Sequence, residues 1–146
     1  MERDEARALF ATARVARLAT VGSEGRPHLV PVCFALDSDR ICTAVDRKPK
    51  RTTRLRRLAN VAANPMVSVL ADRYDEDWSS LWWVRADGAA RILAPGGPEH
   101  ARAIGLLAER YTQYADDPPA GPAILVTVST WIGWRADESR PGRPQR

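Results

Sequence analysis

The sequence of 146 residues has no long apolar run and only two cysteines, and both shortages exclude some classes of protein. No apolar run approaches the roughly 20 residues that a membrane-spanning helix needs, so we expect no membrane association. The first residues are mixed in charge and no apolar segment follows them, which argues against a secretory signal and favours the cytoplasm. The apolar fraction of 45% nevertheless excludes a disordered chain and suffices for one domain with one core.

Motifs for several kinds of active site are also missing. The two cysteines, Cys33 and Cys42, lack metal-ligand spacing. In a reducing compartment we expect both to be buried and to pack as small hydrophobic residues, and a disulfide across a hairpin is the weaker alternative. No spacing of histidine, cysteine and carboxylate predicts a metal site. The sequence contains no Gly-x-Ser-x-Gly, Gly-x-Gly-x-x-Gly or Walker motif, which argues against a serine hydrolase, a Rossmann domain and a nucleoside triphosphate site.

Hydrophobic periodicity predicts about six strands and three helices, with most strands grouped near the front of the chain. Because parallel pairs need long crossovers, the short links between the first three strands predict an antiparallel meander, and the grouping favours a mainly β, α+β barrel over a doubly wound sheet. We expect one domain over residues 1–136 and a polar, disordered tail over 137–146. The expected helices open the chain and cover 50–63 and 99–114, and the expected strands cover 15–21, 28–36, 40–45, 66–71, 80–93 (with a kink or turn at Gly88) and 123–134.

Positive charge gathers between one predicted strand and the following helix. Seven of the eleven residues from Arg47 to Arg57 are basic, whereas the net charge of the whole chain is +4. Backbone N–H groups at a helix start, hydroxyls and cationic side chains all attract anions, so this segment predicts a site for a defined anionic ligand. A solvated basic helix start without a ligand is one alternative. A nucleic-acid site is another, but we expect no nucleic-acid partner because no aromatic residues interleave the basic ones.

Tryptophan and histidine supply the remaining candidates. Trp82 and Trp83 face opposite sides of any strand, so at most one points to a core while the other faces a groove or a partner subunit; core packing is the alternative. His28 begins a strand after a turn and is a candidate for lining a pocket, a structural role being the alternative. His100 lies in the first turn of a predicted helix and is expected at the surface.

Several segments, in their order and spacing, resemble a known superfamily. Residues 16–21 and 25–32 look like the opening two strands of pyridoxamine-phosphate-oxidase-like split barrels. The basic stretch 48–57, followed by 64–70, is similar to their phosphate-binding segment and next strand, and 83–90 resembles their V-x-G-x-A strand. The resemblance covers most of residues 5–135. It implies a split β-barrel of the flavin-reductase or FMN-binding kind, with six or so mostly antiparallel strands and flanking helices.

Within that superfamily the chain looks most like the short branch that uses the deazaflavin coenzyme F420. The resemblance implies a homodimer with two cofactor sites at the subunit interface, and hydride transfer between the deazaflavin ring and a small organic substrate. This hydride transfer requires no side-chain acid or base. An FMN-dependent oxidase or reductase of the same fold is one alternative, and a non-catalytic flavin or deazaflavin carrier is another.

The same resemblance suggests which residues would hold the cofactor. The expected phosphate ligands are Lys48, Lys50, Arg51, Thr52 and Thr53, with Arg54 and Arg57 as further candidates because the basic segment is longer than the Ser-Arg-Lys pattern of FMN oxidases. The strand residues His28, Val30, Pro31 and Val32 would pass along the ring, and Trp82 or Trp83 would close the pocket. We expect no activity on pyridoxamine phosphate, because the C-terminal arginine- and histidine-bearing segment of the true oxidases is missing.

Overall fold

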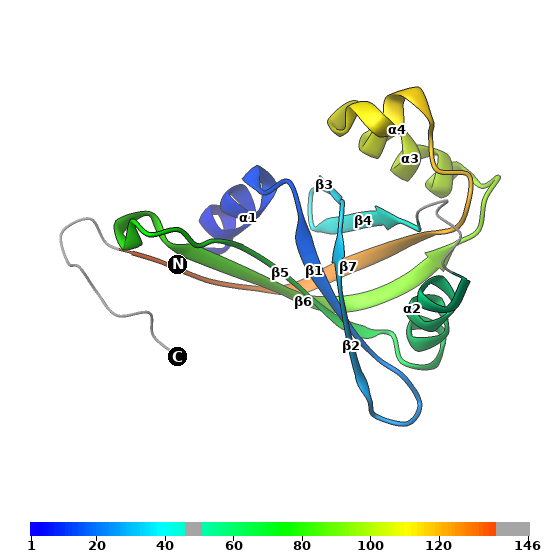
Figure 1. Cartoon of the computed structure of the whole chain (residues 1–146), viewed down its shortest axis with the longest axis horizontal. Coiled ribbons are helices and arrows are strands. Elements are labelled where there is room, and N and C mark those ends of the chain that lie inside the picture. The colour runs from blue at the N-terminus through cyan, green and yellow to red at the C-terminus, as the bar shows by residue number, and fades with distance from the viewer. Residues whose placement is uncertain (46–50, 137–146) are drawn as a thin grey trace.

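The structure is a computed structural model that describes residues 1–45 and 51–136, with backbone alone for 51–55. Seven strands form one sheet in the order β2-β1-β5-β6-β7-β4-β3, and every neighbouring pair is antiparallel. Figure 1 shows the sheet curled into a half-open barrel, with α1, α3 and α2 placed around it. The expected mainly β split barrel is confirmed. In chain order the elements are α1 (Arg3–Thr12), β1 (Ala16–Val21), β2 (Pro27–Val32), β3 (Ala35–Asp37), β4 (Arg40–Ala44), α2 (Arg51–Ala63), β5 (Met66–Arg73), the 3-10 helix η1 (Trp78–Ser80), β6 (Trp82–Leu93), α3 (Pro98–Arg110), α4 (Thr112–Asp116) and β7 (Ala123–Arg135).

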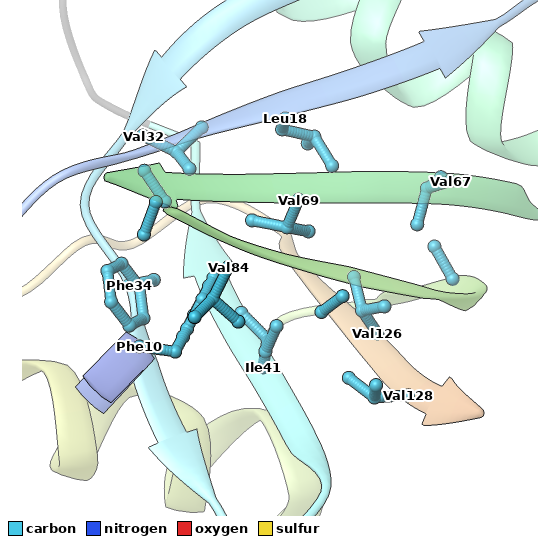
Figure 2. Packing of buried hydrophobic residues seen from close by; sticks show 14 of the residues in the cluster. Phe10, Leu18, Val32, Phe34, Ile41, Val67, Val69, Val84, Val126 and Val128 are labelled. Atoms are coloured by element: carbon cyan, nitrogen blue, oxygen red, sulfur yellow. The ribbon is translucent and has the colours of Figure 1, made fainter. Parts of the chain in front are cut away.

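The main core lies on the concave side of the sheet. Alternating residues of the strands point inward, and the ring of Phe10 on α1 packs 4.8 Å from that of Phe34 and 5.3 Å from that of Trp131, between centroids. Figure 2 shows how aliphatic side chains from several strands surround Phe10 and Phe34. The largest of these aliphatic residues that are fully buried are Leu18, Ile41, Ile124, Val69, Val84 and Val126.

A second cluster lies under α3, and it contains one of the two cysteines. Cys42 is buried with Leu107 and Leu125, and burial raises the pKa of its thiol to about 11. Cys33 is half-buried, and neither cysteine forms a disulfide. The expectation of small, packed hydrophobic residues is confirmed for Cys42 and in part for Cys33.

The antiparallel pairings predicted for the first three strands are confirmed, but the prediction of one continuous meander is wrong. The expected strand 28–36 is interrupted after Val32, so that β2 pairs with β1 while β3 pairs with β4 at the opposite end of the strand order. The curled sheet brings its two edges together, so a link of two residues, Cys33 and Phe34, is long enough to join them. At this link Thr43 Oγ1 donates a hydrogen bond to the Cys33 carbonyl at 2.7 Å, and the Phe34 N–H donates to the Tyr111 hydroxyl at 3.0 Å.

Two expectations for the third helix also fail. The helix is divided into α3 and α4 at Tyr111, whose extended backbone turns its side chain toward Phe34. His100 is buried rather than exposed, because the loop before β7 folds over the first turn of α3 and the ring Nε2–H donates to the Gly121 carbonyl at 2.8 Å. None of the helices in the described ranges is long and apolar enough to span a membrane.

The long ribbon of β6 and β7 contains the expected kink at Gly88. The register of the two strands shifts between Asp87 and Gly88, where the strands approach so closely that a Cβ on Gly88 would lie 2.2 Å from the Thr127 carbonyl oxygen. A side chain of any size is therefore excluded there unless the ribbon moves. This bulge increases the local bend of the sheet.

Replacing Gly88 with alanine should lower the free energy of unfolding by roughly 1–3 kcal/mol, because the added methyl group meets backbone atoms that cannot move away independently. Gly105, on α3, is the matched control: a Cβ there meets nothing within 4 Å, so Gly105→Ala should stabilise the fold by about 0.5–1 kcal/mol. Urea unfolding followed by circular dichroism measures both changes. Equal effects of the two substitutions would contradict the close approach at Gly88.

Candidate functional site

Helix α2 is fixed across the end of the β1–β2 hairpin where β2 begins. The helix packs against β1 and β6. The Asn60 side-chain amide donates to Thr20 Oγ1 at 3.0 Å, and Gly22 lies so close that a Cβ there would be 2.6 Å from Asn60 Oδ1. Thr20 is the cross-strand partner of His28. The contacts of Asn60 therefore set the side of α2 that faces His28.

His28 occupies a cationic corner between β2 and α2. Its ring is half-buried, and its Nδ1 is buried without a hydrogen-bond partner among the described residues. Burial lowers the pKa of His28, and the positive charges of Arg56 and Arg57 lower it further. Arg56 is exposed and Arg57 half-buried. A neutral imidazole beside two guanidinium groups leaves this corner with a positive potential that favours an anion.

Part of the predicted phosphate segment lies outside the described residues. This applies to Lys48 and Lys50, whereas for Arg51, Thr52, Thr53 and Arg54 the structure describes the helical backbone alone. The expected helix over 50–63 is confirmed by α2. Arg57 is the one predicted phosphate ligand with a described side chain, and it acts on His28.

The residues predicted to pass along a cofactor ring are divided between the two faces of the sheet. Val30 packs against the core and Val32 is buried in it, whereas Pro31 and its neighbour Leu29 point to the convex side. The Val32 side chain therefore packs in the core. His28 carries the one polar side chain of β2, and it lies on the side of α2.

The convex side of the sheet, which we name the outer face, carries an apolar surface around a charged centre. The strand registers place Leu29, Met66, Leu70 and Ile132 on this one face, and Leu29 and Met66 are 66% and 60% exposed. Near its middle, Asp87 accepts hydrogen bonds from Ser68 Oγ at 2.7 Å and Arg85 Nε at 2.9 Å. Although burial opposes it, these bonds and the Arg85 charge lower the pKa of Asp87.

Trp82 and Trp83 face opposite sides of β6, as the alternation predicts. Trp83 pairs with Trp134 on the outer face, whereas Trp82 packs against the core and lines an open groove of about 660 Å³. The groove lies between α1, η1 and the ends of β6 and β7, far from α2 in Figure 1. Six residues, or about 20 Å of strand, separate Trp82 from Gly88. Within one chain, the tryptophans and the His28 corner lie at different ends of the sheet.

Two residues of the corner, Arg56 and Asn60, were not predicted from the sequence. Arg56 lies in the basic run, but its proximity to His28 has no sequence signal, and Asn60 looks like an ordinary polar helix residue. The Tyr111 hydroxyl has a structural role, because it accepts a hydrogen bond from the Phe34 N–H and lies 2.9 Å from the carbonyl oxygens of Arg14 and Phe34. Within the described ranges, no group of three histidine, cysteine or carboxylate residues gathers around a metal-sized site.

The family of the chain follows from its match to a family model. The model described as pyridoxamine 5'-phosphate oxidase matches residues 3–135, so the chain belongs to this family. A curated relative, a 5a,11a-dehydrotetracycline/5a,11a-dehydrooxytetracycline reductase of Streptomyces rimosus, is 37% identical over 84 residues. That match covers 57% of this chain and 58% of the relative, so the chain spans little more than half of the reductase.

Solved structures share the fold at lower identity. A conserved hypothetical protein of Mycobacterium tuberculosis aligns with a TM-score of 0.72 and 23% identity, over 100% of this chain and 92% of that protein. An FAD-binding protein of Mesorhizobium loti aligns with a TM-score of 0.67 and 20% identity, over 91% of this chain and 94% of that protein. At these identities the likeness shows the split-barrel fold.

The lowered pKa of His28 predicts how stability depends on pH. Because its ordinary pKa is about 6.5 and the folded value lies lower, the unfolded chain binds more protons just below pH 6.5. His28 therefore destabilises the fold as pH falls through 6.5 toward the folded value. His28→Gln should reduce the loss of unfolding free energy between pH 7 and pH 5. Urea unfolding at several pH values measures this, and identical pH profiles for the two proteins would refute the shift.

Proposed function

We propose that this protein is an oxidoreductase that transfers a hydride between the deazaflavin coenzyme F420 and a small organic substrate. Membership of the pyridoxamine 5'-phosphate oxidase family and the partial match to a named reductase support an oxidoreductase or flavin-binding role. The observation that carries the proposal is the cationic corner, where α2 and β2 place two arginines beside a half-buried histidine. A phosphate-bearing cofactor fits that chemistry.

The chain's own residues would bind and orient the cofactor, which supplies the hydride chemistry when bound. The start of α2 offers helical N–H groups to a phosphate, and Arg57 adds positive charge on the side facing the hairpin. The buried Nδ1 of His28 offers a hydrogen-bonding atom with no protein partner among the described residues. These features fit an anionic group.

We further propose that two copies of the chain pair through the outer face. Leu29, Met66, Leu70 and Ile132 form an exposed apolar surface whose burial would be favourable. A two-fold axis through the middle of that face would exchange the two ends of β6. It would thus bring the tryptophan end of one copy toward the α2 corner of its partner. This arrangement supports a site that both subunits complete, with Trp82 or Trp83 closing it.

A flavin is the second candidate cofactor. The Mesorhizobium loti protein with the same fold is an FAD-binding protein, and the family is named for an oxidase of pyridoxamine phosphate. An FMN-dependent oxidase or reductase would use the same cationic corner for its phosphate. A carrier without catalytic activity would also use it, but would not oxidise a reduced cofactor when substrates are offered.

Removing one phosphate ligand should weaken cofactor binding about tenfold to a hundredfold, since a charge-assisted hydrogen bond contributes roughly 1.5–3 kcal/mol. We expect this for Lys50→Ala and Arg51→Ala, titrated separately with F420 and FMN by absorbance or fluorescence. Arg102→Ala is the charge-matched control, because Arg102 lies on α3 and pairs with Asp37 at 2.9 Å.

The titrations decide between the cofactors. Tighter binding of F420, with turnover of a reduced cofactor, supports the deazaflavin enzyme. Tighter binding of FMN assigns the flavin alternative. Binding of neither cofactor, or equal binding by all variants, would overturn the proposed site.

A charge on the outer face should separate the subunits. Leu29→Asp would bury a carboxylate in an apolar interface, so the dimer dissociation constant should rise at least tenfold. Ala101→Asp adds the same charge at an exposed position of α3 and should leave the dimer intact. Light scattering after size exclusion at micromolar concentration reports both. A monomeric wild-type protein would contradict the dimer and the shared site together.

A further inference from the structure

We propose that the groove beside Trp82 is a binding site for an uncharged, planar ring compound that carries both a hydroxyl and a carbonyl group. The groove holds about 660 Å³, which lies within the range of about 300–1,000 Å³ typical of small-molecule sites. It lies at the end of the sheet away from α2 (Figure 1), so it is separate from the cationic corner. The inference goes beyond the proposed function and does not depend on which cofactor binds.

Three parts of the fold enclose the groove. Glu5 and Leu9, which are four residues apart, lie on one face of α1 and form one wall. The 3-10 helix η1 forms another wall, and the ends of β6 and β7 close the third side. The Ala136 N–H donates to the Leu81 carbonyl at 2.9 Å. This hydrogen bond holds the chain after β7 beside the chain before β6, so the position of η1 is fixed relative to the strands.

The apolar part of the groove suits a flat ring. Trp82 and Leu9 are half-buried against the core, and both line the groove. Gly133 on β7 adds no side chain, and a Cβ there would lie 2.6 Å from the Met1 sulfur. The strand surface near Trp82 is therefore covered at this point by a methionine side chain, which is flexible and can move aside. An aromatic ring that enters here can stack on the accessible part of the indole.

The hydroxyl groups of η1 determine what a ligand must donate. Ser79 Oγ donates to Asp77 Oδ1 at 2.6 Å, and Ser80 Oγ donates to Asp77 Oδ2 at 3.3 Å. The hydrogen bonds from Ser79 lower the pKa of Asp77, so its carboxylate is ionised at neutral pH and can only accept. Each serine has one hydroxyl hydrogen, which Asp77 takes, and its remaining lone pairs can accept. A ligand with a hydroxyl group therefore matches this wall.

An ion pair on the other side determines the charge of the ligand. Arg135 Nε lies 3.2 Å from Glu5 Oε1, so the two charges are paired. A guanidinium has five N–H donors, so Arg135 can donate others to a carbonyl oxygen of a ligand. Glu5 and the ionised Asp77 would repel an anion, and Arg135 would repel a cation. The ligand that fits is therefore uncharged and carries a carbonyl oxygen.

The two neighbouring tryptophans take different roles in this assignment. Trp82 faces the groove, whereas Trp83 pairs with Trp134 on the outer face. Trp83 is then the tryptophan available to a cofactor site that two copies share. Ligand binding in the groove and cofactor binding at the α2 corner should therefore respond to different substitutions.

The probe is 6-acetyl-2-naphthol, an uncharged fused-ring compound with a hydroxyl group on one ring and a carbonyl group on the other. The full-length protein, without added cofactor, is titrated with the naphthol and followed by NMR of the tryptophan indole N–H groups. We expect the Trp82 resonance to shift, and the resonance of Trp131, whose indole donates to Asp39 at 3.0 Å, to stay in place. The methyl ether of the naphthol cannot donate and should bind about threefold to tenfold more weakly, because one neutral hydrogen bond is lost.

Three variants test the assignment. Ser79→Ala combined with Ser80→Ala removes the acceptors, so the naphthol and its methyl ether should then bind equally. Ser129→Ala is the matched control, because Ser129 is exposed on β7 outside the groove lining, and it should have no effect. Trp82→Leu should weaken binding of both compounds about tenfold, since stacking on the indole is lost. If Trp82→Leu does not fold, the wild-type NMR result and the serine variants decide.

A parallel titration with FMN separates this inference from the proposed function. The double serine variant should leave the affinity for FMN unchanged, and Lys50→Ala should leave the affinity for the naphthol unchanged. An unshifted Trp82 resonance, equal binding of the naphthol and its methyl ether by the wild type, or tighter binding of the anionic 6-hydroxy-2-naphthoate would overturn the inference. Binding of the naphthol in the groove by a protein that binds neither F420 nor FMN would support the inference and refute the proposed function alone.

Discussion

Two residues, Cys33 and Phe34, connect strands that lie at opposite edges of a seven-stranded sheet, and this short connection constrains the whole molecule. Three peptide units span no more than about 11 Å, so the edges formed by β2 and β3 must approach each other. The sheet can meet this requirement only by curling. The link is held by the bonds from Thr43 and to Tyr111, and by Arg110, whose guanidinium lies 4.5 Å from the Phe34 ring centroid.

The curl gives the sheet two unequal faces and two distinct ends. The concave face is filled by α1 and the inward side chains, whereas the convex face keeps exposed apolar residues around the Arg85–Asp87 pair. One end is covered by α2 and is cationic, and the other holds the groove beside Trp82. One copy of the chain holds these two kinds of surface apart, and in the proposed dimer they would meet across the two-fold axis.

The α2 corner illustrates how electrostatics and folding oppose each other at a binding site. Burial disfavours the charged form of the half-buried His28 ring, and the positive charges of Arg56 and Arg57 disfavour it further, so the pKa of His28 is lowered. The neighbouring Asn60–Thr20 hydrogen bond holds the arrangement in place. By contrast, Asp39 is matched within the fold, because it accepts a hydrogen bond from Trp131 Nε1 at 3.0 Å and pairs with Arg3 and Arg7.

Local pattern and composition determine much of the secondary structure of this protein. The alternation in β6, the kink at Gly88, the helix over α2 and the order of segments typical of the family are all readable from the sequence, because each depends on neighbouring residues. Tertiary structure alone decided the rest. The burial of His100, the break at Tyr111 and the pairing of β2 away from β3 depend on contacts between distant segments. The same holds for Arg56 beside His28, since only the packing of α2 on β1 brings the basic run to the hairpin.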